Sequence, residues 1–227
     1  MRVNLRRTTV LWLAVISAAA FLLLALLVAG QADPLVRFDA WVSAGAHTAA
    51  LAHPHWRSVM AGVTMTGSTV VLGLLVALGC LILLVRGRVR QAVFAVVATL
   101  AVLWLRLIPL AIVARTRPVE QLAPASNDSF PSGHTTASSA VALILVLVCW
   151  PLLNRPWARI VLAVTAGLWA LAVGVSRVAL VVHWPTDVLG AWLFVLPIVL
   201  ALFRLLPADE RAGRTPAEPP PRTEARS

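Results

Sequence analysis

The sequence contains no lysine, and charged residues make up only 12% of its 227 positions. Soluble globular domains carry about a quarter of their residues as charges, so this composition argues against a soluble domain. The nineteen basic residues are all arginines and outnumber nine acidic residues, which gives a net charge of +10. In a soluble protein that excess would indicate nucleic acid. Here 60% of the residues are hydrophobic, so we attribute the charge to arginines beside membrane headgroups and predict no nucleic-acid partner.

Cysteine is also scarce, with Cys80 and Cys149 both lying inside apolar runs. Neither belongs to a CxxC or zinc-type spacing, so we interpret both as small core residues rather than as a disulfide. The histidines at 47, 53 and 55 could bind a metal, but the stretch His53-Pro54-His55 has no acidic or cysteine partner nearby, which favours a solvated loop. We therefore predict no metal and no cofactor. The absence of lysine, together with the abundance of Ala, Val and Leu, indicates a GC-rich bacterial genome.

Long apolar runs dominate the rest of the chain. A run of about 20 apolar residues spans a bilayer as a helix, and helices satisfy the backbone hydrogen bonds that lipid cannot. The first run is flanked by arginines like a signal peptide, but it exceeds the usual apolar core of about 7–15 residues. We therefore expect an uncleaved anchor and an all-α, polytopic bundle of six transmembrane helices. The predicted spans are Val10–Ala29, Val59–Val85, Gln91–Ala114, Thr135–Trp150, Trp157–Leu180 and Val188–Leu206.

Two segments fall outside these spans. Residues 31–58 are too polar to cross, but Leu35, Phe38, Val42 and Ala46 recur at helical spacing and predict a short interfacial helix. Residues 207–227 are rich in Pro, Arg and Glu and lack apolar residues, so we predict a disordered tail. The domain is thus expected to cover residues 1–206, with the tail in the cytoplasm.

The arginines are distributed unevenly between the two ends of the predicted spans. Because cytoplasmic loops carry more arginine and lysine, the larger group places both termini in the cytoplasm and the smaller group outside. Arg106 falls inside a span and belongs to neither group. The larger group has thirteen members, Arg2, Arg6, Arg7, Arg86, Arg88, Arg90, Arg155, Arg159, Arg204, Arg211, Arg214, Arg222 and Arg226, and the smaller has five, Arg37, Arg57, Arg115, Arg117 and Arg177.

Three of the outward segments contain polar residues that a membrane protein has no structural reason to gather. They are Ala114-Arg115-Thr116-Arg117-Pro118, Phe130-Pro131-Ser132-Gly133-His134-Thr135, and Ser176-Arg177-x5-His183-x3-Asp187. Arginines match phosphate oxygens, and free amides at a helix start attract anions. Histidines exchange protons near neutral pH. This combination predicts metal-independent phosphoryl transfer at helix ends on the extracytoplasmic face.

The second and third segments resemble the type 2 phosphatidic acid phosphatase superfamily, which shares its fold with the vanadium haloperoxidases. That family carries Lys-x6-Arg-Pro, Pro-Ser-Gly-His and Ser-Arg-x5-His-x3-Asp motifs, and the last two are complete at 131–134 and 176–187. The resemblance covers residues 33–206. It implies that His183 is the nucleophile, that Asp187 orients it, and that His134 is the general acid and base. It further implies that Arg117, Ser132, Gly133 and Arg177 bind the substrate phosphate.

The first motif departs from the family, because Leu110 occupies the lysine position. Arg106 lies four residues earlier on the same helical face and is one candidate to supply the missing charge. Arg115 is the other candidate. The alternative for Arg106 is a hydrogen bond that ties helices together. Near the outer end of the second span, Thr64, Thr66, Gly67 and Ser68 are more typical of small-residue packing than of a site.

The resulting expectation is an integral membrane enzyme that hydrolyses a lipid phosphate or diphosphate through a phosphohistidine. Phosphatidic acid, phosphatidylglycerol phosphate and polyprenyl diphosphate all fit, and membrane lipids are the expected partners. A haloperoxidase is disfavoured because those relatives are soluble. The other class of function is a non-catalytic protein that binds or moves lipid phosphates, which the leucine at position 110 favours. Both histidines and Asp187 favour catalysis, since binding needs only the arginines.

Overall fold

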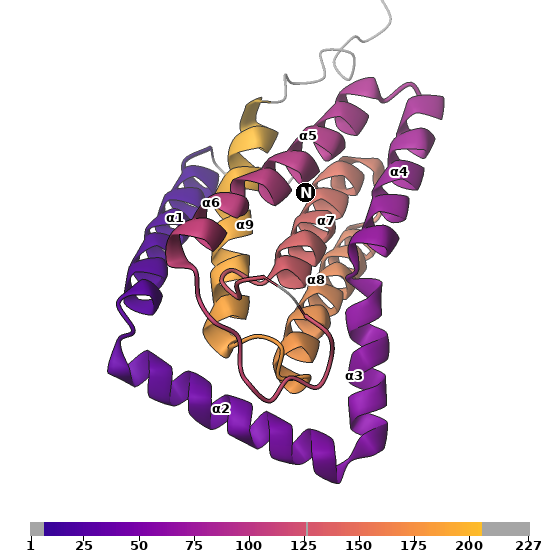
Figure 1. The fold of residues 1–227 in the computed structure, drawn as a ribbon. Helices are drawn as coiled ribbons and strands as arrows, with labels where there is room; N and C mark the ends of the chain where they lie inside the picture. The colour runs from indigo at the N-terminus through magenta and orange to yellow at the C-terminus, as the bar shows by residue number, and fades with distance from the viewer. Residues whose placement is uncertain (1–6, 126, 206–227) are drawn as a thin grey trace, which may run out of the picture.

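The computed structural model describes residues 7–125 and 127–205, and the regular structure within these ranges is helical. The helices form a bundle with one long helix, α2, lying across one end (Figure 1), which confirms the all-α fold class. The predicted tail, 207–227, lies outside the described residues. The helices are α1 Arg7–Ala29, α2 Asp33–Ala52, α3 Pro54–Thr66, α4 Thr69–Val85, α5 Val89–Leu105, α6 Leu107–Val113, α7 Gly133–Cys149, α8 Pro156–Ala179 and α9 Pro185–Leu205, with a 3-10 turn at Trp150–Leu152.

Among the described residues, five helical segments are long and apolar enough to cross a membrane, and α3 with α4, which are bent by 43° at their junction, would make a sixth if the pair is one span. The predicted span Val59–Val85 therefore consists of two helices rather than one. The bend lies at Gly67 and Ser68, where Gly67 ends α3 and the Ser68 hydroxyl caps α4 by accepting a bond from the Val71 amide. A capping serine satisfies amides that would otherwise be unpaired at a helix start, so a break is tolerated within an apolar run.

The third span is also interrupted. We predicted a continuous helix over Gln91–Ala114, but α5 ends at Leu105 and α6 begins at Leu107, with Arg106 between them. Pro109 explains the interruption, because its ring lacks an amide hydrogen and crowds the carbonyl four residues earlier. The interruption falls at a charged residue, Arg106.

Helix α2 links α1 to α3 across the end of the bundle (Figure 1). It has 20 residues, so the expected interfacial helix is present but is not short. Phe38 and Trp41 are exposed, whereas Asp39 between them is buried. A buried carboxylate requires partners.

Helices α7 and α9 lie at the centre of the bundle (Figure 1). The segment that leads into α7 packs against α1 and α9 through Phe130. The buried Phe130 ring stacks on Phe21, with ring centroids 5.8 Å apart. Gly190 of α9 makes room for this ring, since a Cβ there would lie 2.5 Å from its Cε2 atom. This packing sets the position of the residues that follow Phe130, which include Ser132, Gly133 and His134.

Candidate active site

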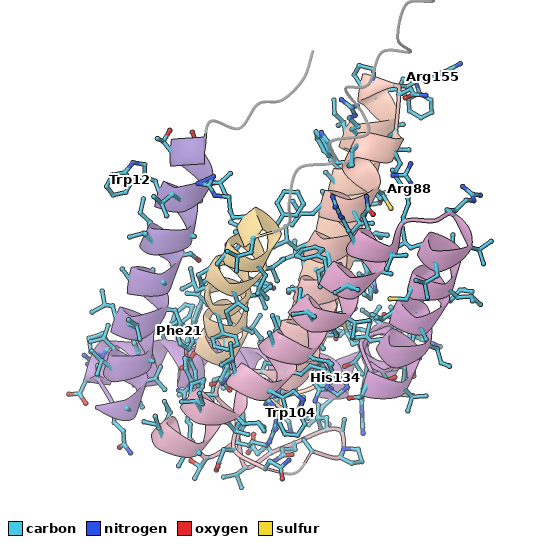
Figure 2. All side chains as sticks on the ribbon, turned by 90° about the horizontal axis from the view of Figure 1, so that it is seen from above. Trp12, Phe21, Arg88, Trp104, His134 and Arg155 are labelled. Atoms are coloured by element: carbon cyan, nitrogen blue, oxygen red, sulfur yellow. The ribbon has the colours of Figure 1, made fainter. Side chains whose placement is uncertain are left out.

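Three segments meet at the end of the bundle that α2 covers: the loop after α6, the start of α7, and the connection from α8 to α9. Figure 2 shows His134 near this end, whereas Arg88 and Arg155 lie toward the opposite end. The structure therefore brings together the three polar segments that the sequence predicted would share a surface. It also separates them from arginines of the larger group.

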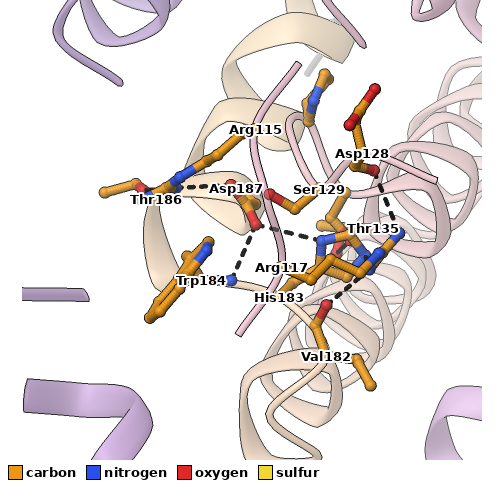
Figure 3. Close-up of polar contacts among 12 residues, drawn as sticks. Arg115, Arg117, Asp128, Ser129, Thr135, Val182, His183, Trp184, Thr186 and Asp187 are labelled. Atoms are coloured by element: carbon orange, nitrogen blue, oxygen red, sulfur yellow. Dashed lines mark hydrogen bonds and ion pairs between the residues drawn. The ribbon is translucent and has the colours of Figure 1, made fainter. Parts of the chain in front are cut away.

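The side chains of His183 and Asp187 contact each other inside this cluster (Figure 3). Both are buried, and the His183 Nδ1 atom lies 3.3 Å from an Asp187 carboxylate oxygen, Oδ2. The same oxygen accepts a 2.9 Å hydrogen bond from the Trp184 amide. Helix α9 begins at Pro185, as predicted, so this carboxylate closes the first turn like the acid of a capping box. Asp187 is thereby both a helix cap and a partner of His183.

The turn before His183 has an unusual backbone. Val181 follows the last turn of α8 with a φ of 54°, a left-handed conformation that is strained for a β-branched residue. The Val182 amide bonds to the Arg177 carbonyl and the Val181 amide to the Val178 carbonyl, which is the Schellman arrangement that glycine usually completes. This turn reverses the chain and directs His183 back into the cluster.

The environment of His183 favours a neutral imidazole. Burial lowers its pKa to about 4, although the hydrogen bond and the charge of Asp187 oppose that change. The Nε2 atom lies 2.9 Å from the Arg117 Nη1 atom. Since a guanidinium only donates, Nε2 carries the lone pair and Nδ1–H donates to Asp187. The nitrogen with the lone pair therefore faces a cation.

Arg117 is held from several directions by the loop that carries it. Its guanidinium donates to the carbonyl oxygens of Val182, Asn127 and Asp128 at 2.6, 2.8 and 3.3 Å. Burial lowers its pKa from the ordinary value, and the charges of Asp187 and Asp128 partly offset this. An arginine remains charged under such conditions, so a fixed positive charge lies beside the His183 lone pair.

Arg177 supplies a second cation from the last turn of α8. Arg177 is 4% exposed and donates from Nη1 to the Thr64 hydroxyl at 2.7 Å, while its Nε has no hydrogen-bond partner among the residues that the structure describes. A buried donor without a partner is costly, and a phosphate oxygen would satisfy it. The interpretation of the 64–68 cluster as packing holds for Gly67, which lies against Val173. It missed the contact of Thr64 with Arg177.

Arg106 reaches the same cluster from the break between α5 and α6. Its Nε donates to the Pro131 carbonyl at 2.9 Å. A Cβ at position 133 would lie 3.1 Å from the Arg106 Cζ atom, so Gly133 lets the guanidinium lie directly against the start of α7. Arg106 is also within electrostatic reach of Arg117. The structure thus places Arg106 among the predicted phosphate-binding residues.

His134 and Ser132 occupy the start of α7. His134 is half-buried and lies within electrostatic reach of Arg106, Arg117, Arg177 and His183. Ser132 is buried, and its amide already donates to the Asp187 carbonyl at 3.1 Å. Its hydroxyl accepts a bond from the Thr135 hydroxyl. Only the Ser132 hydroxyl hydrogen, and not its amide, is therefore available for the predicted phosphate contact.

Arg115 has different partners. It donates to the second carboxylate oxygen of Asp187, Oδ1, at 2.7 Å and to Asp39 at 2.6 Å. It also donates to the Thr186 hydroxyl and lies over the Trp184 ring. Of the two candidates to replace the missing lysine, Arg115 therefore bonds to carboxylates, whereas Arg106 bonds to a backbone carbonyl. Asp39 and Thr186 were not among the predicted site residues, and the one signal for Asp39 was an acid inside an apolar stripe.

The assembled site combines a neutral imidazole, an orienting carboxylate, a second histidine and the guanidinium groups of Arg106, Arg117 and Arg177. Within the described residues, no three His, Cys, Asp or Glu side chains cluster as metal ligands would. Such a site can bind a phosphoryl group, stabilise its charge and present a nitrogen nucleophile to it.

The sequence model of one protein family, the PAP2 superfamily, matches residues 81–211 of this chain. The chain therefore belongs to the PAP2 superfamily.

Two particular proteins are similar to it. It is 42% identical over 69 residues to the Escherichia coli K12 protein named "Putative undecaprenyl-diphosphatase YbjG", a match that spans 30% of each chain. Its fold is that of a transmembrane PAP2-type phosphatidylglycerolphosphate phosphatase from Bacillus subtilis, with a TM-score of 0.69, 24% identity, and coverage of 83% of this chain and 94% of that one. The chain is thus a multi-pass membrane protein of a phosphatase family.

Proposed function

We propose that this protein hydrolyses a lipid phosphate or diphosphate on the extracytoplasmic face of the membrane, through a phosphohistidine at His183. The observation that carries the proposal is the His183 imidazole. Its Nδ1 side faces Asp187, and its Nε2 side faces Arg117. A histidine held in this way is a prepared nucleophile rather than a simple anion ligand.

The first step transfers the phosphoryl group to the protein. The His183 Nε2 lone pair attacks phosphorus, and the bond from phosphorus to the leaving oxygen breaks. His134 donates a proton to that oxygen. Arg106, Arg117 and Arg177 hold the nonbridging oxygens and offset the charge that grows on them.

The second step releases phosphate. His134, now neutral, removes a proton from water, and the water oxygen attacks phosphorus while the N–P bond breaks. The Nδ1 proton of His183 stays hydrogen-bonded to Asp187 throughout. No step in this scheme requires a metal ion, and we propose a metal-independent enzyme.

The names of the two similar proteins support a lipid substrate with a phosphate or diphosphate headgroup. Apolar helices surround the site, so a substrate that keeps its tail in the bilayer reaches the helix ends with its headgroup. Phosphatidic acid, phosphatidylglycerol phosphate and polyprenyl diphosphate share this chemistry. The runner-up is binding without hydrolysis, which Leu110 favours because it removes one charge from the first motif.

Phosphate release by the purified protein from these three lipids tests the proposal. We expect turnover with at least one lipid, inhibition by vanadate, and retained activity in EDTA. The His183→Ala variant should lose turnover and any acid-labile phosphoenzyme, whereas His134→Ala should form the phosphoenzyme slowly or leave it trapped.

His55→Ala is the matched control, since His55 is exposed on α3 and lies outside the site. Full activity in folded His183→Ala would contradict the nucleophile. Tight lipid-phosphate binding without turnover in the wild type would favour the runner-up. Activity that EDTA abolishes and Mg²⁺ or Zn²⁺ restores would contradict metal independence.

A further inference from the structure

The carboxylate of Asp187 is shared between two groups. One oxygen faces the His183 imidazole, and the other accepts a 2.7 Å hydrogen bond from Arg115 Nη1 (Figure 3). The carboxylate is fully buried, so the Arg115 contact is a charge-assisted bond away from water, which is stronger than a neutral one. Any shift of Arg115 therefore moves the group that orients the nucleophile.

Arg115 is held in turn by a second buried carboxylate. Asp39 of α2 is 1% exposed and accepts a 2.6 Å bond from Arg115 Nη2. Its carboxylate also accepts bonds from the amide and the hydroxyl of Thr186, the residue before Asp187. The Thr186 hydroxyl accepts a further bond from Arg115. Asp39 thus fixes both Arg115 and the first turn of α9.

We propose that Asp39 and Arg115 are positioning residues that hold Asp187, and through it the His183 imidazole, in the orientation for attack on phosphorus. The proposal rests on the proposed function for its catalytic meaning. Neither residue contacts the reacting atoms. Through Asp39, helix α2 thereby positions the site, although its sequence indicates only an interfacial helix.

The two positioning residues carry opposite charges, so their removal has opposite electrostatic effects on His183. Loss of the Arg115 charge leaves two carboxylates without their shared cation, which favours imidazolium and raises the pKa of His183. Loss of the Asp39 charge leaves Asp187 as the one carboxylate bonded to Arg115, and this change does not raise the pKa of His183. The other charged or titratable groups that act on His183 remain in both variants: Arg117, Arg177 and His134.

The test compares Asp39→Asn, Arg115→Gln and Arg115→Lys with the wild type in the full-length protein. Because a misplacement of about 1 Å can cost about a hundredfold in rate, we expect kcat to fall by about tenfold to a hundredfold in the first two variants. KM should change little, since Asp187 does not bind the phosphate. The acidic limb of the pH profile, expected near 4 in the wild type, should lie higher in Arg115→Gln than in Asp39→Asn. Arg115→Lys should recover part of the rate.

Ser43→Ala is the matched control, because Ser43 lies one turn further along α2, is buried, and has no hydrogen-bond partner for its hydroxyl. Its kcat and pH profile should match the wild type. A merely structural role for Asp39 would lower the melting temperature of Asp39→Asn and leave the kcat of its folded fraction unchanged. That result would overturn the proposal.

A nuclear magnetic resonance titration of ring-labelled histidine separates this proposal from the proposed function. If the wild type releases no phosphate from any lipid, the proposed function fails, but the His183 titration still decides the positioning role. A higher His183 pKa in Arg115→Gln than in the wild type supports it. An unchanged pKa and tautomer in folded Arg115→Gln would overturn it.

Discussion

At the scale of single residues, the arginines of the site differ in the groups to which they donate hydrogen bonds. Arg106 donates to a backbone carbonyl and Arg177 to a hydroxyl, and neither bond neutralises the guanidinium charge. Arg115 instead lies between two carboxylates. Positive charge at the start of α7 therefore comes from Arg106 and Arg177 together with Arg117, whereas Arg115 is available to position Asp187.

The position of Arg106 predicts that it supplies the charge that Leu110 lacks. Arg106→Ala should reduce kcat/KM for lipid phosphate by about ten- to more than a hundredfold, because a charged hydrogen bond contributes about 1.5–3 kcal/mol. Adding Leu110→Lys should restore part of the loss, since position 110 lies one turn along from Arg106. Turnover and melting temperature should be measured on the same preparation.

Arg159→Ala is the control for this substitution. Arg159 also donates to a backbone carbonyl, that of Leu153, but it lies on α8 near Arg155 and far along that helix from Arg177. Its removal should leave turnover unchanged. A well-folded Arg106→Ala protein with normal turnover would show that Arg106 only ties the helix break to the Pro131 carbonyl.

At the scale of secondary-structure elements, the site depends on how helices end and how closely they approach. The break between α5 and α6 releases Arg106, the left-handed Val181 ends the turn after α8, and Asp187 caps α9. Close packing then fixes α7 relative to α9 through Phe130. Strained backbone of this kind persists only where surrounding structure enforces it.

The contact of Phe130 with Gly190 predicts a large effect from a single methyl group. In Gly190→Ala the new Cβ would lie 2.5 and 2.7 Å from ring atoms of Phe130. Overpacking of this kind costs about 1–3 kcal/mol, and it would displace the segment that carries His134. We expect a lower melting temperature and a lower kcat, measured on purified protein.

Gly167→Ala on α8 is the matched control, because a methyl group added there would have no atom within 4 Å beyond the backbone of its own helix. Alanine favours a helix over glycine by about 0.5–1 kcal/mol, so its melting temperature should not fall. Replacing the ring by a smaller side chain, in Phe130→Leu, should partly restore the melting temperature and kcat of Gly190→Ala. A Gly190→Ala protein as stable and active as the wild type would show that the ring moves aside without consequence.

At the scale of the whole molecule, the arginines mark two ends of the bundle. Arg88 and Arg155 lie toward the end opposite the site, and Arg115, Arg117 and Arg177 lie within it (Figures 2 and 3). Which end faces the cytoplasm stays a prediction from the thirteen-to-five arginine asymmetry.

Cysteine labelling in intact cells tests this orientation, in a background where Cys80 and Cys149 are replaced by alanine. Pro124→Cys lies in the exposed outer loop and should react with a membrane-impermeant maleimide. Arg86→Cys, at the exposed end of α4, should react only after the membrane is permeabilised. Labelling with the reverse pattern would invert the topology.

Much of this architecture follows from composition and local pattern. Apolar runs of bilayer length predict the spans because lipid allows no unpaired backbone, and Pro185 with Asp187 predicts the start of α9. The two complete motifs predict which polar residues share a surface. The bend at Gly67 and the break at Arg106 were missed. The Ser68 cap decides the first and Pro109 the second, and the hydrophobicity of a run reports neither.

The sequence by itself determined the class of protein, its apolar spans and the residues that can handle phosphate, because these depend on residue type and spacing along the chain. Only the tertiary structure decided how the arginines divide their roles. Asp39 is 76 residues from Arg115 and 147 from Thr186, so no local pattern relates them. The partners of each guanidinium depend on which helix ends pack together, and that packing places Arg106 against Gly133 and Arg115 between two carboxylates.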